Sequence, residues 1–203
     1  MKAMILKDML CLKKQMKSLL MVLLIWLVIS AATSNGLFFS VLGVVYIIML
    51  PMTTLSYDER AGWDSRALTM PVTRAQLVVG RYITALLAGL ALCAVGAVVT
   101  AVMDGVDKAP ASLGFFLLGV LMLSVSMPVI LKLGVEKGRL VVMLFYVVPF
   151  GALLISEKLG LDPITALQRL DSPAALMLSA ALIFLLLCVS AAVSVGIYKK
   201  KEF

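Results

Sequence analysis

Residues 55–81 read LSYDERAGWDSRALTMPVTRAQLVVGR and form a polar island in an otherwise apolar chain. This stretch holds three of the eleven acidic residues and four of the eighteen basic residues. Apolar segments flank it on both sides, and charged side chains are costly inside a bilayer. The stretch therefore marks the connection between two membrane helices, and the rest of the chain is organised around it.

Two capping boxes predict structure within this connection. Ser56 with Glu59, and Thr73 with Gln76, have the spacing at which a hydroxyl and a carboxyl or amide group satisfy free backbone N–H groups at a helix start. Pro71 lies between the boxes, and a proline ends one helix or stands near the start of the next. The pattern predicts a short helix over 57–68, a break over 69–72 and a second helix that begins near Arg74.

The composition of the short helix favours a docking surface. Trp63 and Leu68 provide large apolar groups among charged neighbours, and Trp, Tyr and Arg dominate contacts between proteins. A plain turn would need only a few residues. Two alternatives stay open, namely a solvated connector and a lipid anchor at Trp63. The expected docking residues are Tyr57, Asp58, Glu59, Arg60, Trp63, Asp64, Arg66, Pro71 and Arg74.

The whole chain has the composition of a polytopic membrane protein. Of its 203 residues, 63% are hydrophobic and 14% are charged, and the mean hydropathy is +1.11. We therefore treat residues 1–203 as a single transmembrane domain. The three cysteines lie in apolar or amphipathic segments and imply no disulfide framework. The basic residues behind the net charge of +7 flank apolar segments, so a membrane explains them better than nucleic acid does.

Residues 1–18 are expected to form an amphipathic helix in the membrane interface. Five lysines share one broad arc of the helical wheel, and apolar residues occupy the other. Lysines in such a helix contact anionic headgroups. A cleaved signal peptide is the alternative, but the basic region is long for one and the following Ser-Ala-Ala-Thr is a weak cleavage sequence.

Six apolar segments predict an all-α fold with six transmembrane helices. Thr33–Gly36 has the composition of a tight turn, so the first two spans should form a hairpin. Pro51 and Pro149 are expected to kink or interrupt the spans that contain them. The expected spans are residues 19–32, 37–55, 83–102, 113–131, 140–155 and 174–197.

The distribution of basic residues predicts the orientation. With the N-terminus in the cytoplasm, fifteen basic residues lie in cytoplasmic segments, and only Lys108, Lys158 and Arg169 lie outside. Such an asymmetry is typical of the positive-inside rule. Both termini are therefore expected in the cytoplasm, and residues 56–81 with them.

A ridge of small residues marks one face of the expected third span. Small side chains recur at every fourth position and let another helix approach closely. Alanine and glycine are also common in membrane spans, and the pattern does not say whether the neighbour belongs to the same chain. The ridge consists of Ala85, Gly89, Cys93, Ala97 and Ala101.

Several kinds of chemistry have no matching residues. No charged residue lies inside an expected span and the chain has no histidine, so the usual proton relay is missing. The thirteen methionines favour soft packing over copper binding. The closest approach to a phosphate-binding GxxxxGK[ST] loop, at Gly134–Arg139, has the wrong spacing. We expect no enzyme activity and no cofactor in this chain, so uphill transport would draw its energy from another subunit.

Several short motifs, in this order between six apolar segments, resemble the ABC-2-type permease subunits of bacterial ABC exporters. The resemblance covers essentially the whole chain, and it is nearest to permeases of Gram-positive exporters of amphipathic or antimicrobial peptides. One departure is Arg81, where lysine is expected, and the charge is kept. The motifs are Leu6-Lys7-Asp8, Tyr57-Asp58-Glu59 with Trp63, Thr69–Arg74, Gly80–Tyr82, and Pro128 with Lys132–Arg139.

The resemblance implies a permease that exports hydrophobic or amphipathic molecules such as peptides across the bacterial cytoplasmic membrane. It implies a second permease subunit, identical or different, and two copies of an ATP-binding subunit that hold ATP and magnesium. It also implies that residues 56–81 contain a coupling helix that rests on the ATPase. The alternative function is an ATP-independent membrane sensor or scaffold whose loop binds another protein.

Overall fold

The computed structural model describes residues 7, 16–67, 73–144 and 173–200, and every regular element within them is a helix. The expected all-α class is therefore confirmed for this part of the chain. Residues 135–144 are helical as well. The labelled elements are α2 (Met16–Ala32), α3 (Leu37–Ala61), α4 (Trp63–Ala67), α5 (Arg74–Asp104), the 3-10 helix η1 (Val106–Lys108), α6 (Ala111–Leu133) and α9 (Pro173–Lys200).

Four of these helical stretches are long and apolar enough to cross a membrane. They contain the expected second, third and fourth spans and residues 177–197 of the sixth, which lies within α9 as a whole. The first expected span is a shorter apolar helix, Leu20–Ala32. The fifth is described, and helical, only as far as residue 144. The six-span count therefore stays a prediction, and most of the interfacial helix over 1–18 lies outside the described residues, as does Pro149. The four stretches are Leu37–Ala61, Arg74–Asp104, Val106–Leu133 and Met177–Lys200.

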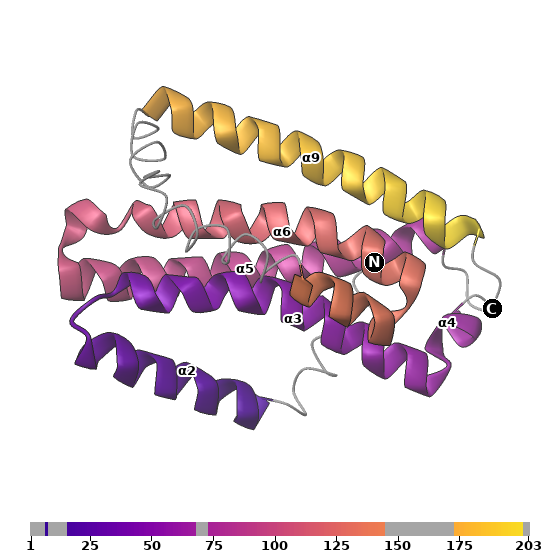
Figure 1. The fold of residues 1–203 in the computed structure, drawn as a ribbon, viewed down its shortest axis with the longest axis horizontal. Coiled ribbons are helices and arrows are strands. Elements are labelled where there is room, and N and C mark those ends of the chain that lie inside the picture. Colours follow the sequence, from indigo (N-terminus) through magenta and orange to yellow (C-terminus); the bar gives the residue numbers. More distant parts are fainter. Residues whose placement is uncertain (1–6, 8–15, 68–72, 145–172, 201–203) are drawn as a thin grey trace.

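The long helices form one bundle (Figure 1). α3, α5 and α6 pack against one another, α9 lies against α5 and α6, and α2 packs against α3. The core draws fully buried side chains from the three central helices, among them Ile47, Val78 and Leu123. Large apolar side chains on the outer faces of α2, α5 and α9 remain exposed, as expected of helices that face lipid.

The start of the predicted short helix is wrong. α3 does not end at Leu55, where the expected span ends, but continues past Asp58 and Glu59 to Ala61. Ser56 lies inside this helix, so the predicted Ser56–Glu59 capping box does not form. Gly62 ends α3 in the left-handed region at φ 60°, where its N–H points to the carbonyls of Asp58 and Glu59. The short helix that follows is α4 alone.

The second capping box is confirmed. The Gln76 N–H donates to Thr73 Oγ1 at 3.3 Å, and the Thr73 N–H donates to Gln76 Oε1 at 3.1 Å. These reciprocal bonds satisfy two free donors at the start of α5. The helix begins at Arg74, as the sequence predicts, and runs nine residues further back than the expected span over 83–102.

The predicted turn joins α2 to α3 as a hairpin (Figure 1). Ser34 adopts a positive φ of 48°, and Ser30 Oγ donates to the Asn35 carbonyl at 2.8 Å. The Gly36 N–H donates to the Asp104 carboxylate at the far end of α5. A carboxylate at the start of α3 also interacts favourably with the helix dipole, so this contact ties the hairpin to the bundle.

The small-residue ridge of α5 faces α3 over part of its length. Ala85 and Gly89 are buried, and Gly89 lies against Ile47 of α3. A step of four residues rotates about 40° around an α-helix, so Ala97 and Ala101 turn away and are half-exposed.

Other small residues of α5 continue the contact with α3. Gly96 packs on Ser40, and Thr100 lies against Gly36 at the start of α3. Cys93 sits between the two sets of contacts, and its Sγ lies 3.6 Å from the Ser112 carbonyl of α6. The contact face therefore follows the true helical period of about 3.6 residues.

Gly36→Ala is expected to lower the melting temperature of the detergent-solubilised protein. A Cβ atom on Gly36 would lie 2.5 Å from the Thr100 Cα, a backbone atom that moves only with α5. Overpacking of this kind costs about 1–3 kcal/mol. Gly114→Ala is the matched control, because the space around Gly114 is open and alanine favours a helix. Thermal unfolding followed by circular dichroism measures both, and an unchanged melting temperature for Gly36→Ala contradicts the close approach.

Candidate functional site

A buried charge cluster lies at the polar end of the bundle, which we define as the end where α3 ends, α5 begins and α9 ends. At its centre is Asp58, whose side chain is 5% exposed. Lys7 Nζ lies 2.6 and 2.7 Å from the two carboxylate oxygens, and Arg81 Nη2 donates to Oδ2 at 3.0 Å. The Arg81 side chain is only 3% exposed. Removing one partner of an ion pair this deeply buried strongly destabilises the folded protein.

Aromatic rings enclose the cluster. Lys7 Nζ lies 4.8 Å from the centroid of the Trp63 ring, and Arg81 Cζ lies 5.9 Å from that of Tyr198. Both distances suit cation–π contacts. Tyr198 is fully buried, and Trp63 packs against the main core. The cluster therefore joins α3, α4, α5 and α9 to Lys7 of the N-terminal segment.

Arg74 secures the end of α9. Its Nη1 donates to the carbonyls of Tyr198 and Lys199 at 3.3 and 2.7 Å. A cation at a helix C-terminus interacts favourably with the helix dipole and satisfies carbonyls that have no partner within the helix. Both acceptors are backbone carbonyls of α9.

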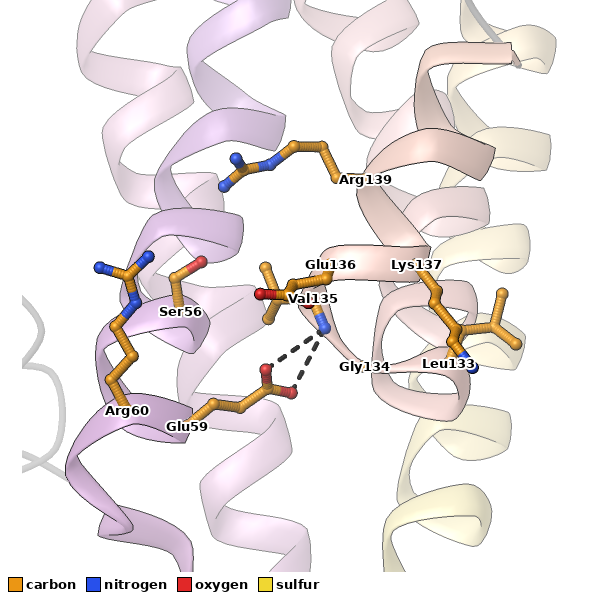
Figure 2. A pocket seen from close by; sticks show the side chains of 9 residues that line it. All are labelled: Ser56, Glu59, Arg60, Leu133, Gly134, Val135, Glu136, Lys137 and Arg139. Carbon is orange, nitrogen blue, oxygen red and sulfur yellow. Dashed lines mark hydrogen bonds between the residues drawn. The ribbon is translucent and has the colours of Figure 1, made fainter.

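Glu59 connects α3 to the helical stretch 135–144 (Figure 2). Its two carboxylate oxygens accept a hydrogen bond from the Val135 N–H at 3.3 and 3.4 Å. The stretch begins just after Gly134, which has a positive φ of 81°. Glu59 thus acts as an N-terminal cap supplied by another helix.

A second polar layer lies deeper in the bundle. The Tyr82 hydroxyl is within 2.8 Å of Ser190 Oγ and 2.9 Å of Ser194 Oγ. Ser190 Oγ also donates to the Ser124 carbonyl of α6. These bonds link α5, α9 and α6, and hydrogen bonds of this kind add specificity to helix packing within a membrane.

The structure divides the expected docking residues into outward and inward groups. Asp58 is buried, and Trp63 and Arg74 are half-buried against the chain itself. Pro71 and the side chain of Asp64 lie outside the described residues. For all nine expected docking residues, buried or exposed, the docking role stays a prediction. The exposed members are Tyr57, Glu59, Arg60 and Arg66.

Sequence reasoning missed the partners of Asp58. Arg81 lies just outside the expected span over 83–102, but α5 is longer and carries it into the bundle. Lys7 was assigned to the membrane interface, whereas it contacts Asp58 from 51 residues away. For the Tyr82 contacts the sequence does carry a signal, because Ser190 and Ser194 are hydroxyls four residues apart on an apolar helix and indicate a polar partner.

Asp58→Asn is expected to lower the free energy of unfolding by about 3–5 kcal/mol, because it removes the carboxylate that pairs with the buried Arg81 guanidinium. Replacing both partners, as in Asp58→Leu with Arg81→Met, should recover much of the loss. Chemical unfolding of the solubilised protein measures these effects. Asp107→Asn, at an exposed position of η1, is the control. A double variant that is no more stable than Asp58→Asn would show that the pair is not coupled.

Comparison with known proteins gives one match. The model of a family described as "ABC-2 family transporter protein" matches residues 3–199, which include nearly all of the helices described above. No curated protein and no solved structure matches the chain. Permeases of this family are membrane components of transporters and normally work with a separate ATP-binding subunit. The chain therefore belongs to the ABC-2 transporter family, as the motifs of its polar stretch predict.

Proposed function

We propose that this chain is the permease subunit of an ATP-driven exporter of hydrophobic or amphipathic molecules, such as peptides. It works with a second permease subunit and with two copies of an ATP-binding subunit that carry ATP and magnesium. The family match supports a role in transport. The observation that carries the coupling part of the proposal is the buried cluster around Asp58, because it connects the exposed tip of α3 to two further membrane helices.

The tip of α3 and α4 is the proposed docking surface. Tyr57 and Arg66 are exposed there, and aromatic and arginine side chains are frequent anchors in protein interfaces. Behind the tip, Asp58 pairs with Arg81 of α5, Trp63 lies against Lys7, and Arg74 of α5 bonds the end of α9. The outward residues would bind the ATPase, and the inward ones would make the tip rigid.

Force applied to this tip would reach the membrane helices through two polar layers. ATP binding draws the ATP-binding subunits together and pushes on the tip. The Asp58–Arg81 pair transfers that displacement from α3 to α5. The Tyr82 hydroxyl, bonded to Ser190 and Ser194, transfers it from α5 to α9. Rocking of the helices then alternates access to the two sides of the membrane.

The charge distribution supports a cytoplasmic polar end. Among the described residues, one basic side chain, Lys108, lies at the opposite end of the bundle. The polar end carries Arg60, Arg66, Arg74, Lys132, Lys137, Arg139, Lys199 and Lys200. Under the positive-inside rule this end faces the cytoplasm of a bacterial cell, and both termini lie on that side.

Tyr57→Ala is expected to weaken binding of the ATP-binding subunit by about thirtyfold, since loss of an aromatic anchor costs about 2 kcal/mol. Arg66→Ala should weaken it as well. Lys108→Ala, at the opposite end, should bind normally. Titration of the purified chain in nanodiscs with its cognate ATPase gives the dissociation constants. Wild-type affinity in both tip variants, or failure of the wild-type chain to bind a P-loop ATPase, contradicts the proposal.

A cysteine at Asp107 is expected to react with a membrane-impermeant maleimide added to intact cells, in a background without the three native cysteines. A cysteine at Ala61, which is exposed at the tip of α3, should react only after the cells are permeabilised. This pattern follows from the excess of basic residues at the polar end. The reverse pattern would overturn the orientation.

A further inference from the structure

A cleft separates α3 from the helical stretch 135–144 at the polar end (Figure 2). It encloses about 320 Å³. Ser56, Glu59 and Arg60 line it from α3, and the segment from Leu133 to Arg139 lines the other side. In Figure 2 the Arg139 side chain extends from its helix across the gap toward α3.

Basic side chains outnumber acidic side chains in the lining of this cleft. Arg60 and Arg139 stand on opposite walls, and neither forms an ion pair or hydrogen bond with the described residues. Lys137 is a third basic group, against the acids Glu59 and Glu136. Glu59 keeps its negative charge while it accepts from the Val135 N–H, so the lining carries three basic and two acidic side chains. The lining thus keeps a net positive charge, and two guanidinium groups on opposite walls that are not ion-paired within the described part of the chain favour an anion that bridges them.

An apolar cleft of about 260 Å³ continues inward from the polar one, and Arg139 lines both. Its floor consists of the buried side chains Ile48, Met52 and Val142. Val45, Met49 and Met143 form its exposed rim. On α3 the lining residues recur every three or four positions, so they share one face of the helix.

The two clefts together have the polarity of one amphiphile. From Arg60 to Val45, α3 rises about 22 Å along its axis, at 1.5 Å per residue. Cationic groups lie at the outer end, and methionine and aliphatic side chains lie at the inner end. Methionine packs readily around flexible apolar chains. A lipid of the surrounding leaflet has the same order, with a charged headgroup at the interface and acyl chains within.

We propose that this composite cleft binds one anionic phospholipid from the leaflet at the polar end. The headgroup phosphate lies between Arg60 and Arg139, and an acyl chain lies along the floor of Ile48, Met52 and Val142. The lipid thereby joins α3 to the segment 135–144, next to the Glu59–Val135 contact.

Native mass spectrometry of the full-length chain tests this proposal. Protein purified in detergent is mixed with phosphatidylglycerol or with phosphatidylcholine of identical acyl chains, and retained lipid is counted. The wild-type chain should retain phosphatidylglycerol preferentially. Arg139→Gln and Arg60→Gln should each reduce that retention about fivefold, the effect of one basic residue at an anionic surface, and leave phosphatidylcholine unchanged.

Lys132→Gln is the matched control, because Lys132 is exposed at the same end but does not line the cleft. Equal loss in this variant would mean a general surface charge effect and would overturn the proposal. Met49→Trp, which fills the apolar part without changing charge, should also reduce phosphatidylglycerol retention. It keeps the test decisive if an arginine variant accumulates poorly.

Two other outcomes also contradict the proposal. If soluble glycerol phosphate displaces the lipid at equal concentration, the site recognises an anion alone. If the wild-type chain is a dimer that Met49→Trp dissociates, the cleft is an interface between two copies.

Discussion

A carboxylate that is nearly sealed from water must be matched by cations, and at the polar end of this bundle Asp58 imposes that requirement. Its counter-charges come from two distant parts of the chain, Lys7 and Arg81. The end of α3 is therefore held against the start of α5 and against the Lys7 side chain. Because Trp63 and Tyr198 enclose the cations, α4 and α9 are held at the same place. The described residues at both ends of the polar connection thus belong to the packed bundle.

This arrangement suits the proposed function, in which force arrives at one end of the subunit and moves helices along its whole length. A flexible loop would absorb the displacement, whereas a tip fixed by a buried ion pair transmits it. Deeper in the bundle, the hydrogen bonds of Tyr82 with Ser190 and Ser194 join α5 to α9 in a similar way. At the opposite end, the Asp104 carboxylate holds the start of α3. Polar contacts therefore position α3 and α5 relative to each other at both ends, and small residues such as Gly89 and Gly96 allow close packing between.

Local signals predicted much of this fold, and long-range contacts account for what they missed. The cap at Thr73 depends on residues within one turn, so the start of α5 was predictable. The capping box predicted at Ser56 does not form, because α3 continues through Ser56. Gly62 ends α3 five residues after the predicted start of the short helix. The small-residue ridge was predicted with a strict four-residue step, and the rotation of a real helix moved its far half away from α3. Neither the Asp58–Arg81 pair nor the Lys7 contact follows from spacing along the chain, since each depends on how the helices pack.

The central claim is that the tip of α3 contacts an ATP-binding subunit, and a photo-crosslinking amino acid at Ala61 tests it most directly. Ala61 is exposed at the end of α3, and Asp107 is exposed at the opposite end of the bundle. Each position is substituted in turn in living cells, and crosslinked partners are identified by mass spectrometry. The account predicts a crosslink from Ala61 to a protein with a phosphate-binding loop, and none from Asp107. A crosslink to such a protein from Asp107, or only to lipid from Ala61, would contradict it.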